Sequence, residues 1–368
     1  MKVLMIGVAS MDTGGIENYL MSLYRNFTIE KHNIDFLVHT QRVGCLEEEI
    51  ISNGSQVYKL PRLSKNPLKY AINLYNIIKE NNYDIVHRHS TGSIMWVDLL
   101  IAKLAGCPIR ISHSHNSDWG HRTLHYVGIP ILNAVATVRL ACGNKAGQWM
   151  YGAKSFDVMN NCIEIDRFKF NKHLRVNKRV ELGVKNDQKV LFVVGRLVEE
   201  KNHKFIIDVL KELYGLKKNF VMFFIGDGPL YEDIDKQITS INAGNYIKLL
   251  GNRRDVADLL NAADLLLMPS LFEGFPISAI EAQCNGLQCY CSDQVSAEID
   301  IDGNTIFSPL DKDIWVNKLD NILDNGIHNE LVRASSWDII DRKGYSQKQA
   351  AINMEKLYTY KYNEIKDD

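Results

Sequence analysis

The sequence lacks any apolar run close to the roughly 20 residues that a membrane-spanning helix needs. Its apolar start, Met1 to Ala9, is too short for a signal peptide and predicts a first buried strand instead. We therefore expect neither a transmembrane anchor nor secretion, and a cytoplasmic location, peripheral at most to the inner face of a membrane.

An excess of one charge sign is also lacking. There are 43 Lys and Arg against 44 Asp and Glu, so the formal net charge is −1 and no nucleic-acid partner is expected. The first 165 residues hold 16 Lys and Arg against 13 Asp and Glu, and 8 of the 11 histidines. This local excess of cations is a hint that the first half could face an anionic membrane or acceptor.

Cysteine occurs seven times, an odd number, and mostly within apolar runs. No pair has metal-ligand spacing together with a matching second pair, so neither a disulfide framework nor a zinc site is predicted. We expect buried thiols, with Cys289 and Cys291 packing in the core. Internal repeats and low-complexity tracts are absent as well.

What is present is a regular alternation of short apolar runs with helical patterns over 368 residues, a length that favours two domains. Such alternation predicts parallel sheets covered by helices on both faces, an α/β fold of two doubly wound, Rossmann-like domains. The expected strands of the first domain lie near residues 2–9, 33–40, 56–60, 84–89, 109–113, 139–142 and 157–159, and those of the second near 189–196, 220–225, 246–250, 264–268, 287–291 and 305–307.

The domain boundary is predicted at residues 171–177, which are rich in Lys, Arg and Asn and poor in apolar residues. We expect a first domain over 1–170 and a second over 171–345. A last helix over 346–368 could pack back on the first domain.

The most informative stretch runs from Ser270 to Ala282 and predicts a turn between a buried strand and a helix. Gly274 allows unusual backbone conformations, Pro276 suits the first helical position, and the amides that follow would sit at the positive end of a helix dipole. Glu273 and Glu281 flank this phosphate-attracting end, where carboxylates could hold sugar hydroxyls. A role limited to complementing the dipole is equally compatible with the pattern.

Two further strand ends could join this site, because ligands of parallel sheets gather at the carboxyl ends of strands. Arg196 and Lys201 follow one strand, although a solvated charged loop would look the same. Gly226 and Gly228 follow the next strand, and they could admit a ligand or simply form a turn. In the first domain, the glycine pair at 14 and 15 lies between the first strand and the first helix, without the third glycine of the dinucleotide fingerprint.

Taken in order and spacing, these motifs resemble glycosyltransferase family 4, retaining enzymes of GT-B fold, and most closely its bacterial exopolysaccharide and capsule branch. The matching pieces are Gly195-Arg196 with Lys201, Gly226-Asp-Gly-Pro229, Leu250-Gly251, Glu273 to Glu281, Gly14-Gly15-Ile-Glu17, Asp84-Ile-Val-His87, His113-Ser-His115-Asn116 and the crossover Asn161-Cys-Ile-Glu164. The resemblance covers almost the whole chain and implies two domains that face each other across a cleft.

The resemblance also implies the roles of individual residues. Arg196 and Lys201 would bind the donor diphosphate, Glu273 the donor sugar, and Glu281 the ribose. His115 would face the reacting sugar. His113 is its rival, because the two histidines alternate along one strand and only one of them can point at the cleft. The implied donor-binding set is Gly14, Gly15, Gly226, Gly228, Asn252, Arg253, Gly274, Phe275, Pro276, Ile277 and Glu281. Pro276 and Cys162 stand where glycine is common in the family.

The implied reaction moves a sugar, by a hexosyltransferase mechanism with retention, from a nucleotide-diphosphate sugar (a UDP-sugar is favoured) to a saccharide or lipid-linked acceptor. No cofactor or metal is expected, since Asp300-Ile-Asp302 has the spacing of a metal motif but predicts a solvated turn. His87, His89, His113 and His115 could ligate a metal, yet strand-end histidines without a carboxylate more often form a polar lining.

Several alternatives stay open. A covalent route would need a nucleophile, for which Asp12, Glu17 and Asp118 are equal candidates, so a front-face displacement is preferred. Residues 119–126 could form an acceptor-facing or membrane-facing loop, or a packed amphipathic helix. A nucleotide-sugar epimerase of the same fold, or a catalytically silent nucleotide-sugar-binding partner of another transferase, would fit the same motifs.

Overall fold

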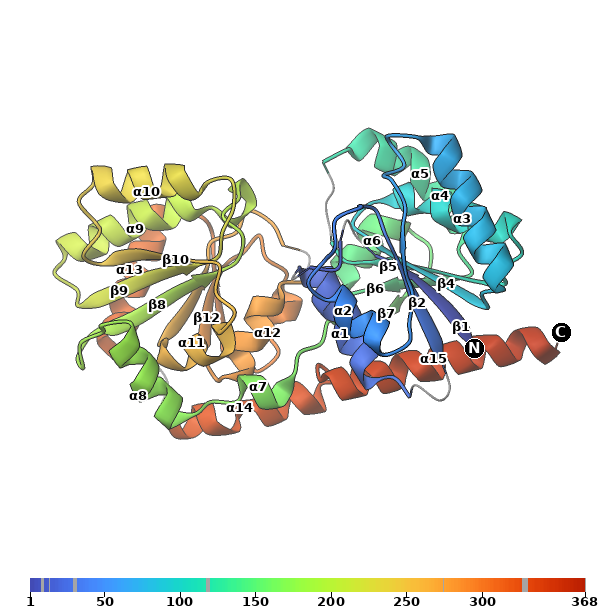
Figure 1. Ribbon diagram of the computed structural model, residues 1–368. Helices are drawn as coiled ribbons and strands as arrows, with labels where there is room; N and C mark the ends of the chain where they lie inside the picture. Colours follow the sequence, from blue (N-terminus) through green and yellow to red (C-terminus); the bar gives the residue numbers. More distant parts are fainter. Residues whose placement is uncertain are drawn as a thin grey trace. The chain divides into compact units, whose positions relative to one another are not determined.

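The computed structural model describes residues 1–7, 10–12, 14–28, 32–116, 120–273, 275–325 and 330–367. The chain forms two compact units, one made of Met1–Cys162 together with Ser346–Asp368 and the other of Ile163–Tyr345. Each unit is a parallel sheet with helices on both faces (Figure 1), as the alternating sequence pattern predicts.

The first unit contains a seven-stranded sheet in the order β3-β2-β1-β4-β5-β6-β7. Its strands are β1 Lys2–Ile6, β2 Asn33–Val38, β3 Val57–Lys59, β4 Ile85–Ser90, β5 Ile109–Ser114, β6 Val138–Ala141 and β7 Asp157–Val158. Its helices are α1 Gly15–Asn26, α2 Glu47–Ser52, α3 Pro67–Asn81, η1 Ser93–Met95, α4 Trp96–Leu104, α5 Arg122–Val135, α6 Asn144–Tyr151 and α15 Gln347–Asp367. Helix α15 packs beside α1, while α3, α4 and α5 lie on the other face of the sheet (Figure 1).

The second unit contains a six-stranded sheet in the order β10-β9-β8-β11-β12-β13. Its strands are β8 Lys189–Val194, β9 Phe220–Ile225, β10 Ile247–Gly251, β11 Leu265–Met268, β12 Gln288–Ser292 and β13 Thr305–Ser308. Its helices are α7 Ile165–Phe168, α8 Lys172–Glu181, η2 Glu199–Lys201, α9 His203–Gly215, α10 Tyr231–Ser240, α11 Val256–Ala262, α12 Ile277–Cys284, η3 Ala297–Ile299, α13 Lys312–Asn325 and α14 Glu330–Arg342.

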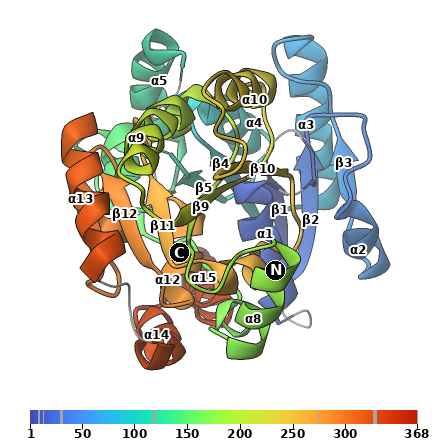
Figure 2. The ribbon, with the colours of Figure 1, turned by 90° about the vertical axis from the view of Figure 1, so that its left-hand side faces the viewer.

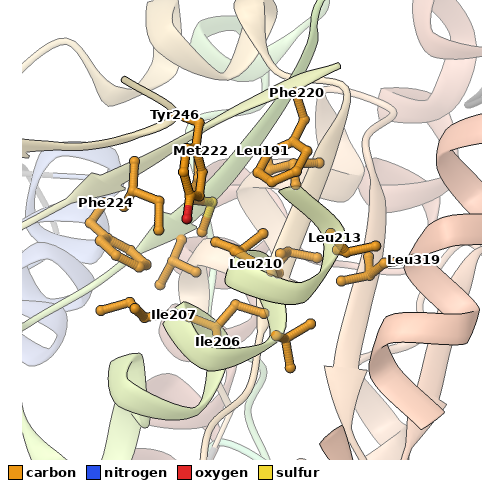
Figure 3. Close-up of a cluster of buried hydrophobic side chains, with 14 of the residues drawn as sticks. Leu191, Ile206, Ile207, Leu210, Leu213, Phe220, Met222, Phe224, Tyr246 and Leu319 are labelled. Atoms are coloured by element: carbon orange, nitrogen blue, oxygen red, sulfur yellow. The ribbon is translucent and has the colours of Figure 1, made fainter. Parts of the chain in front are cut away.

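The core of the second unit shows why its strand sequences are almost continuously apolar. Strand β9 is buried at every position, since helices cover both faces of the sheet. Helices α9, α10 and α13 lie on one face and α11, α12 and α14 on the other (Figures 1 and 2). Side chains of β8 and β9 interlock with those of α9 in a cluster that includes Leu191, Leu210 and Phe224 (Figure 3). This packing fixes the strand ends that carry the candidate site.

Two local features differ from the sequence-based expectation. Residues 171–177, predicted as a domain boundary, belong to helix α8 of the second unit, and the first unit ends at Cys162 instead of residue 170. Composition misleads here because α8 buries none of its residues. It is held by its Asn171 cap and by Arg175 and Arg179, whose guanidinium groups lie 2.5 Å and 3.2 Å from the Asp264 carboxylate.

None of the seven cysteines, all in the described part of the chain, forms a disulfide. Six are buried, and Cys45 is exposed. Cys289 and Cys291 are fully buried in β12, which confirms that they pack in the core.

Candidate functional site

A short charged contact near the carboxyl ends of two strands joins Lys201 to Glu273 in the second unit. The adjacent parallel strands β8 and β11 bring the two segments together at their carboxyl ends. Lys201 Nζ lies 2.5 Å from Glu273 Oε1, and the two side chains are 18% and 15% exposed. This exposure leaves the pair accessible to a ligand while keeping both groups largely out of bulk water. An ion pair in such a partly buried position is more stabilising than one on an open surface.

Two buried serines support the carboxylate of this pair. Ser270 Oγ, at the end of β11, donates to Glu273 Oε1 over 2.8 Å. Ser292 Oγ, at the end of β12, donates to the Ser270 carbonyl over 2.5 Å. Both serines are fully buried, so these two consecutive hydrogen bonds fix the position of the Glu273 carboxylate from the protein interior. Sequence reasoning missed them, although the spacing of Ser270 three residues before Glu273 could have suggested the contact.

Arg196 lies in the same β8–η2 loop as Lys201, but its side chain is exposed. Within the described part of the chain, no hydrogen bond or ion pair joins its guanidinium to Lys201 or Glu273. The two predicted cations therefore differ: Lys201 is already positioned by a carboxylate, whereas Arg196 remains available to an anion from solution.

Gly226 and Gly228 lie against this loop. A Cβ on Gly226, whose φ is +147°, would overlap the Gly195 carbonyl oxygen, and a Cβ on Gly228 would approach the Leu197 amide nitrogen to 2.7 Å. The Leu197 amide also donates to the Asp227 carbonyl over 3.0 Å. In this structure the two glycines thus allow one strand-end loop to pack under another, a role that sequence reasoning had not considered.

Gly195 carries a related constraint, because a Cβ there would meet Lys201 Cε at 2.9 Å. Its φ of +152° is also a value that side chains disfavour. The Lys201 side chain consequently runs along a bare stretch of backbone on its way to Glu273.

The predicted residues around helix α12 occupy different positions. Gly274 lies outside the described residues. Pro276 is the N-cap of α12 and Ile277 its first residue, so the prediction that Pro276 occupies the first helical position was wrong by one residue. Phe275 is buried and stacks on Tyr345 at a centroid distance of 5.8 Å.

Glu281 lies in the second turn of α12 and is half-buried. Burial raises the pKa of its carboxyl to about 7, and the charge of Arg167 acts weakly in the opposite direction. Because burial removes water from this carboxylate, its charged form lacks hydrogen-bond donors, and the hydroxyl groups of a ligand could supply them.

Asn252 and Arg253 follow the edge strand β10, two strands away from β8. Asn252 is exposed. The Arg253 guanidinium donates to Asp255 over 2.7 Å and to Glu181 over 2.7 Å. The hydrogen bonds from Arg253 and from Lys178 hold the pKa of Asp255 well below its usual range. Much of the charge of Arg253 is therefore neutralised within the second unit by Asp255 and Glu181.

In the first unit, Gly14 is the N-cap of α1 and Gly15 its first residue. A Cβ on Gly14 would overlap the Glu17 carboxylate, which folds back over the cap. Burial raises the pKa of Glu17 to about 7, with a smaller contribution from Asp12.

Of the candidate nucleophiles, Asp12 accepts hydrogen bonds from Ser10 and Cys45, and Asp118 lies outside the described residues.

The carboxyl ends of β4 and β5 carry four histidines in one cluster. His87 Nε2 lies 3.3 Å from His113 Nδ1, and His89 Nδ1 lies 2.9 Å from His115 Nε2. We predicted that only one of His113 and His115 can point at the cleft, and which of them faces a sugar stays a prediction. Their rings stack at 4.3 Å and so lie on the same side of the strand. Residues two apart in a strand share a face. His113 is fully buried, whereas His115 is half-buried and is the one a ligand can reach.

One nitrogen each of His87, His89 and His113 lies within 4.8 Å of the others, the spacing of a possible metal set. His87 Nε2 and His113 Nδ1, however, lie 3.3 Å apart in a hydrogen bond between near-parallel rings, with an interplanar angle of 6°. In that geometry each lone pair or proton is directed at the other ring instead of at a common ion. The cluster is therefore built for hydrogen bonding between neutral rings.

The Asp300-Ile-Asp302 segment is less solvated than predicted. Both carboxylates are half-buried and accept backbone amides, Asp300 from Thr305 over 2.9 Å and Asp302 from Asn304 over 3.1 Å. Burial raises the pKa of Asp302 to about 6. These bonds explain the segment as a structured turn before β13.

Comparisons with known proteins agree on one family. The profile "Glycosyl transferases group 1" matches residues 175–335, and "Glycosyltransferase Family 4" matches residues 13–146. The putative glycosyltransferase EpsF of Bacillus subtilis is 32% identical over 80% of this chain and 79% of its own length. The Escherichia coli UDP-Gal:α-D-GlcNAc-diphosphoundecaprenol α-1,3-galactosyltransferase is 27% identical over 80% of this chain and 78% of its length.

Solved structures show the same fold at low sequence identity. A glycosyltransferase from Rickettsia africae superposes with a TM-score of 0.81 at 17% identity, over 98% of each chain. Anabaena HepE, solved in complex with UDP, superposes with a TM-score of 0.80 at 18% identity, over 98% of this chain and 100% of the other.

Proposed function

Because the chain belongs to glycosyltransferase family 4, with two Rossmann-like units of GT-B fold, we propose that it transfers a hexose, with retention, from a UDP-sugar to a saccharide or lipid-linked saccharide in surface polysaccharide synthesis. The donor nucleotide is supported by the UDP bound to HepE and by the UDP-galactose of the E. coli relative. The acceptor class is supported by that relative's diphosphoundecaprenol substrate, and the pathway by the likeness to EpsF.

The observation that carries this proposal is the Lys201–Glu273 pair, supported by Ser270 at the carboxyl end of β11. Lys201, together with the exposed Arg196, binds the donor diphosphate, and Glu273 holds hydroxyls of the donor sugar. Glu281 accepts the ribose hydroxyls. Gly226 and Gly228 remain in the proposed donor region, where they also shape the loop that carries Arg196.

The chemistry needs charge stabilisation above all. The bond between the sugar's anomeric carbon and the phosphate oxygen breaks, and its electron pair stays on the departing UDP. The acceptor oxygen bonds to the anomeric carbon from the same face and passes its proton to the departing phosphate. Fixed cations aimed at such developing charge lower barriers by about 3 to 4 kcal/mol per group, which Lys201 and Arg196 can supply without a metal.

The test is incubation of the purified protein with a radiolabelled UDP-sugar and an undecaprenyl-diphosphate-linked sugar, followed by product analysis. Label in the lipid-linked product, with the anomeric configuration of the donor, is expected. Epimerised free nucleotide sugar would instead identify a GT-B epimerase, and donor binding without turnover would identify a silent partner.

We also propose that the first unit contacts an anionic membrane through helices α3, α4 and α5, which pack side by side. Apolar side chains on this surface are unusually exposed, among them Leu68 at 72%, Leu104 at 68% and Val127 at 64%. The exposed cations of these three helices are Lys69, Lys79, Lys103 and Arg122, and their exposed acid is Glu80. Such a combination suits a lipid surface.

No helix in the described part of the chain is long and apolar enough to cross a bilayer, so this contact would be peripheral. Vesicles containing phosphatidylglycerol should bind the protein at low salt, and phosphatidylcholine vesicles should not. Replacing Leu124 and Val127 by Ser should reduce that binding, and unchanged binding would refute the assignment of this surface.

A further inference from the structure

The four histidines of β4 and β5 form an ordered array whose members share one face of the sheet. The strands are adjacent and parallel, and His89 pairs in register with His113. The ring of His87 lies against that of His89 at a centroid distance of 4.0 Å and a tilt of 32°, and His113 stacks on His115 at 4.3 Å. Hydrogen bonds join His87 to His113 and His89 to His115. The array is thus two hydrogen-bonded pairs laid one on the other.

Burial keeps this array uncharged. His87, His89 and His113 are fully buried. Burial lowers the pKa of His87 and His115 to about 3 and those of the other two well below the usual value. A neutral imidazole has one N–H and one lone pair, so each hydrogen bond in the array couples the position of the proton on one ring to the position of the proton on its partner.

The deep end of the array is anchored by the C-terminal helix. Tyr358 of α15 is fully buried, and its hydroxyl lies 2.6 Å from His87 Nδ1. Tyr19 of α1 packs edge-on against His113 at 5.4 Å and His115 at 5.2 Å. Two helices far apart in sequence therefore restrict the movement of the rings.

The outer end of the array is His115, the half-buried member. One of its nitrogens, Nε2, is held by His89, and a hydrogen bond with the buried Asn161 side chain acts on the same ring. Its orientation is therefore fixed from within the unit before any ligand arrives.

We propose that His89 is a positioning residue for sugar transfer: its Nδ1, hydrogen-bonded to Nε2 of His115, fixes the orientation and the tautomer of the ring that faces the reacting sugar. Tyr358 is hydrogen-bonded to His87, which is hydrogen-bonded to His113, and the rings of His87 and His113 both pack against His89 and hold it in place. The inference rests on the proposed function and on the role that the family resemblance implies for His115, which is to face the reacting sugar. Catalysis then depends on a histidine that itself touches no substrate.

Two substitutions at His89 separate this role from simple packing. An asparagine side chain places an amide close to the position of imidazole Nδ1, so His89→Asn keeps a hydrogen-bonding partner for His115, whereas His89→Leu keeps bulk and loses the bond. We expect His89→Leu to lower kcat about 10- to 100-fold with an unchanged KM for the UDP-sugar, and His89→Asn to recover most of it.

A direct readout of the tautomer comes from ¹⁵N NMR of histidine-labelled protein. In the unaltered protein the ring nitrogens of His115 should show one tautomer, and in His89→Leu a mixture. His125→Leu is the matched control, because His125 is a fully buried histidine of α5 that stacks on Trp149 at a centroid distance of 4.0 Å and is not a member of the array. It should change the melting temperature and leave kcat and the His115 signals unchanged.

Equal losses of kcat in His89→Asn and His89→Leu would overturn the proposal, as would an unchanged His115 tautomer in His89→Leu. Stoichiometric zinc in the purified protein, absent from His87→Asn, would overturn the hydrogen-bonded array. Failure of the proposed function has a different signature: the unaltered protein would transfer no sugar from any UDP-sugar, whatever the tautomer measurements show.

Discussion

Each of the two units has its own parallel sheet and carries its candidate groups at the carboxyl ends of central strands. The chemistry of these groups differs between the units. In the first unit the groups are neutral imidazoles, three of them fully buried. In the second they are ionic, with Lys201 and Glu273 each more than a tenth exposed. The fold thus decides where a site can form, and burial decides whether it can hold charge.

A second contrast lies within each unit's helix ends. Glu17 in α1 and Glu281 in α12 are both half-buried, and burial raises both pKa values to about 7. Glu17 folds over its own helix cap, whereas Glu281 lies in the second turn, where the charge of Arg167 opposes the rise of its pKa. The same shift therefore marks an internal contact in one unit and a proposed ligand contact in the other.

The largest effect should come from removing charge in the second unit. We expect Lys201→Ala to lower kcat/KM about 10²- to 10³-fold, because a fixed cation at the departing diphosphate is lost. The control is Lys204→Ala, three residues further along and exposed, which should stay near the normal rate. Steady-state kinetics with the true donor would contradict the role of Lys201 if both variants transferred sugar equally well.

A smaller effect is expected from disturbing the loop beneath that charge. Gly226→Ala would force Cβ onto the Gly195 carbonyl at a strained φ, at a cost of about 1 to 3 kcal/mol. We expect a lower melting temperature and a roughly tenfold lower kcat, since the Arg196 loop must shift.

Gly244→Ala is the matched control for that loop, because a Cβ there meets nothing within 4 Å. It should leave both the melting temperature and kcat unchanged. If Gly226→Ala were equally silent, the packing of the two strand-end loops would not matter for transfer.

The sequence predicted the sheets well because their strands are apolar runs bounded by turns, and β8, β9 and β11 all appear within two residues of the expected limits. It failed at α8, which is held by arginine contacts to Asp264 instead of an apolar stripe. Hydrophobic periodicity indicates which face of a helix is buried, and it carries no information about an ion pair between residues 89 positions apart, such as Arg175 and Asp264.

The candidate site divides in the same way. Lys201, Glu273 and Ser270 follow strands that pair, so their meeting could be foreseen from the order of elements. The contact of Tyr358 with His87 spans 271 residues, and no local pattern announces it. The pairing of Arg253 with Glu181 was hidden for the same reason, since α8 itself was not predicted.

The raised pKa of Glu281 predicts that rising pH strengthens donor binding and weakens folding stability. As pH rises from about 5 to about 8, Glu281 ionises and becomes a better acceptor for ribose hydroxyls, so the KM for the donor should fall. Over the same range folding stability should fall, because the carboxyl has a higher pKa folded than unfolded and so binds more protons when folded.

Glu281→Gln should remove the Glu281 contribution to both trends, whereas Glu17→Gln should flatten part of the stability profile alone. Donor KM and melting temperature, measured across this range for both variants, would test the contrast. A donor KM that rose with pH in the unaltered protein would contradict the proposed contact of Glu281 with ribose.

The smallest effect should come from Arg253, where the resemblance predicts donor contact and the structure shows internal ion pairs to Asp255 and Glu181. We expect Arg253→Gln to raise the donor KM only two- to threefold and to lower stability by less than about 1 kcal/mol, because partly exposed ion pairs contribute little. Glu181→Gln removes one partner and keeps the guanidinium, so it should match the loss of stability without changing KM. A donor KM raised more than tenfold in Arg253→Gln alone would show that this arginine leaves its carboxylates to bind the donor, as Lys201 is proposed to do.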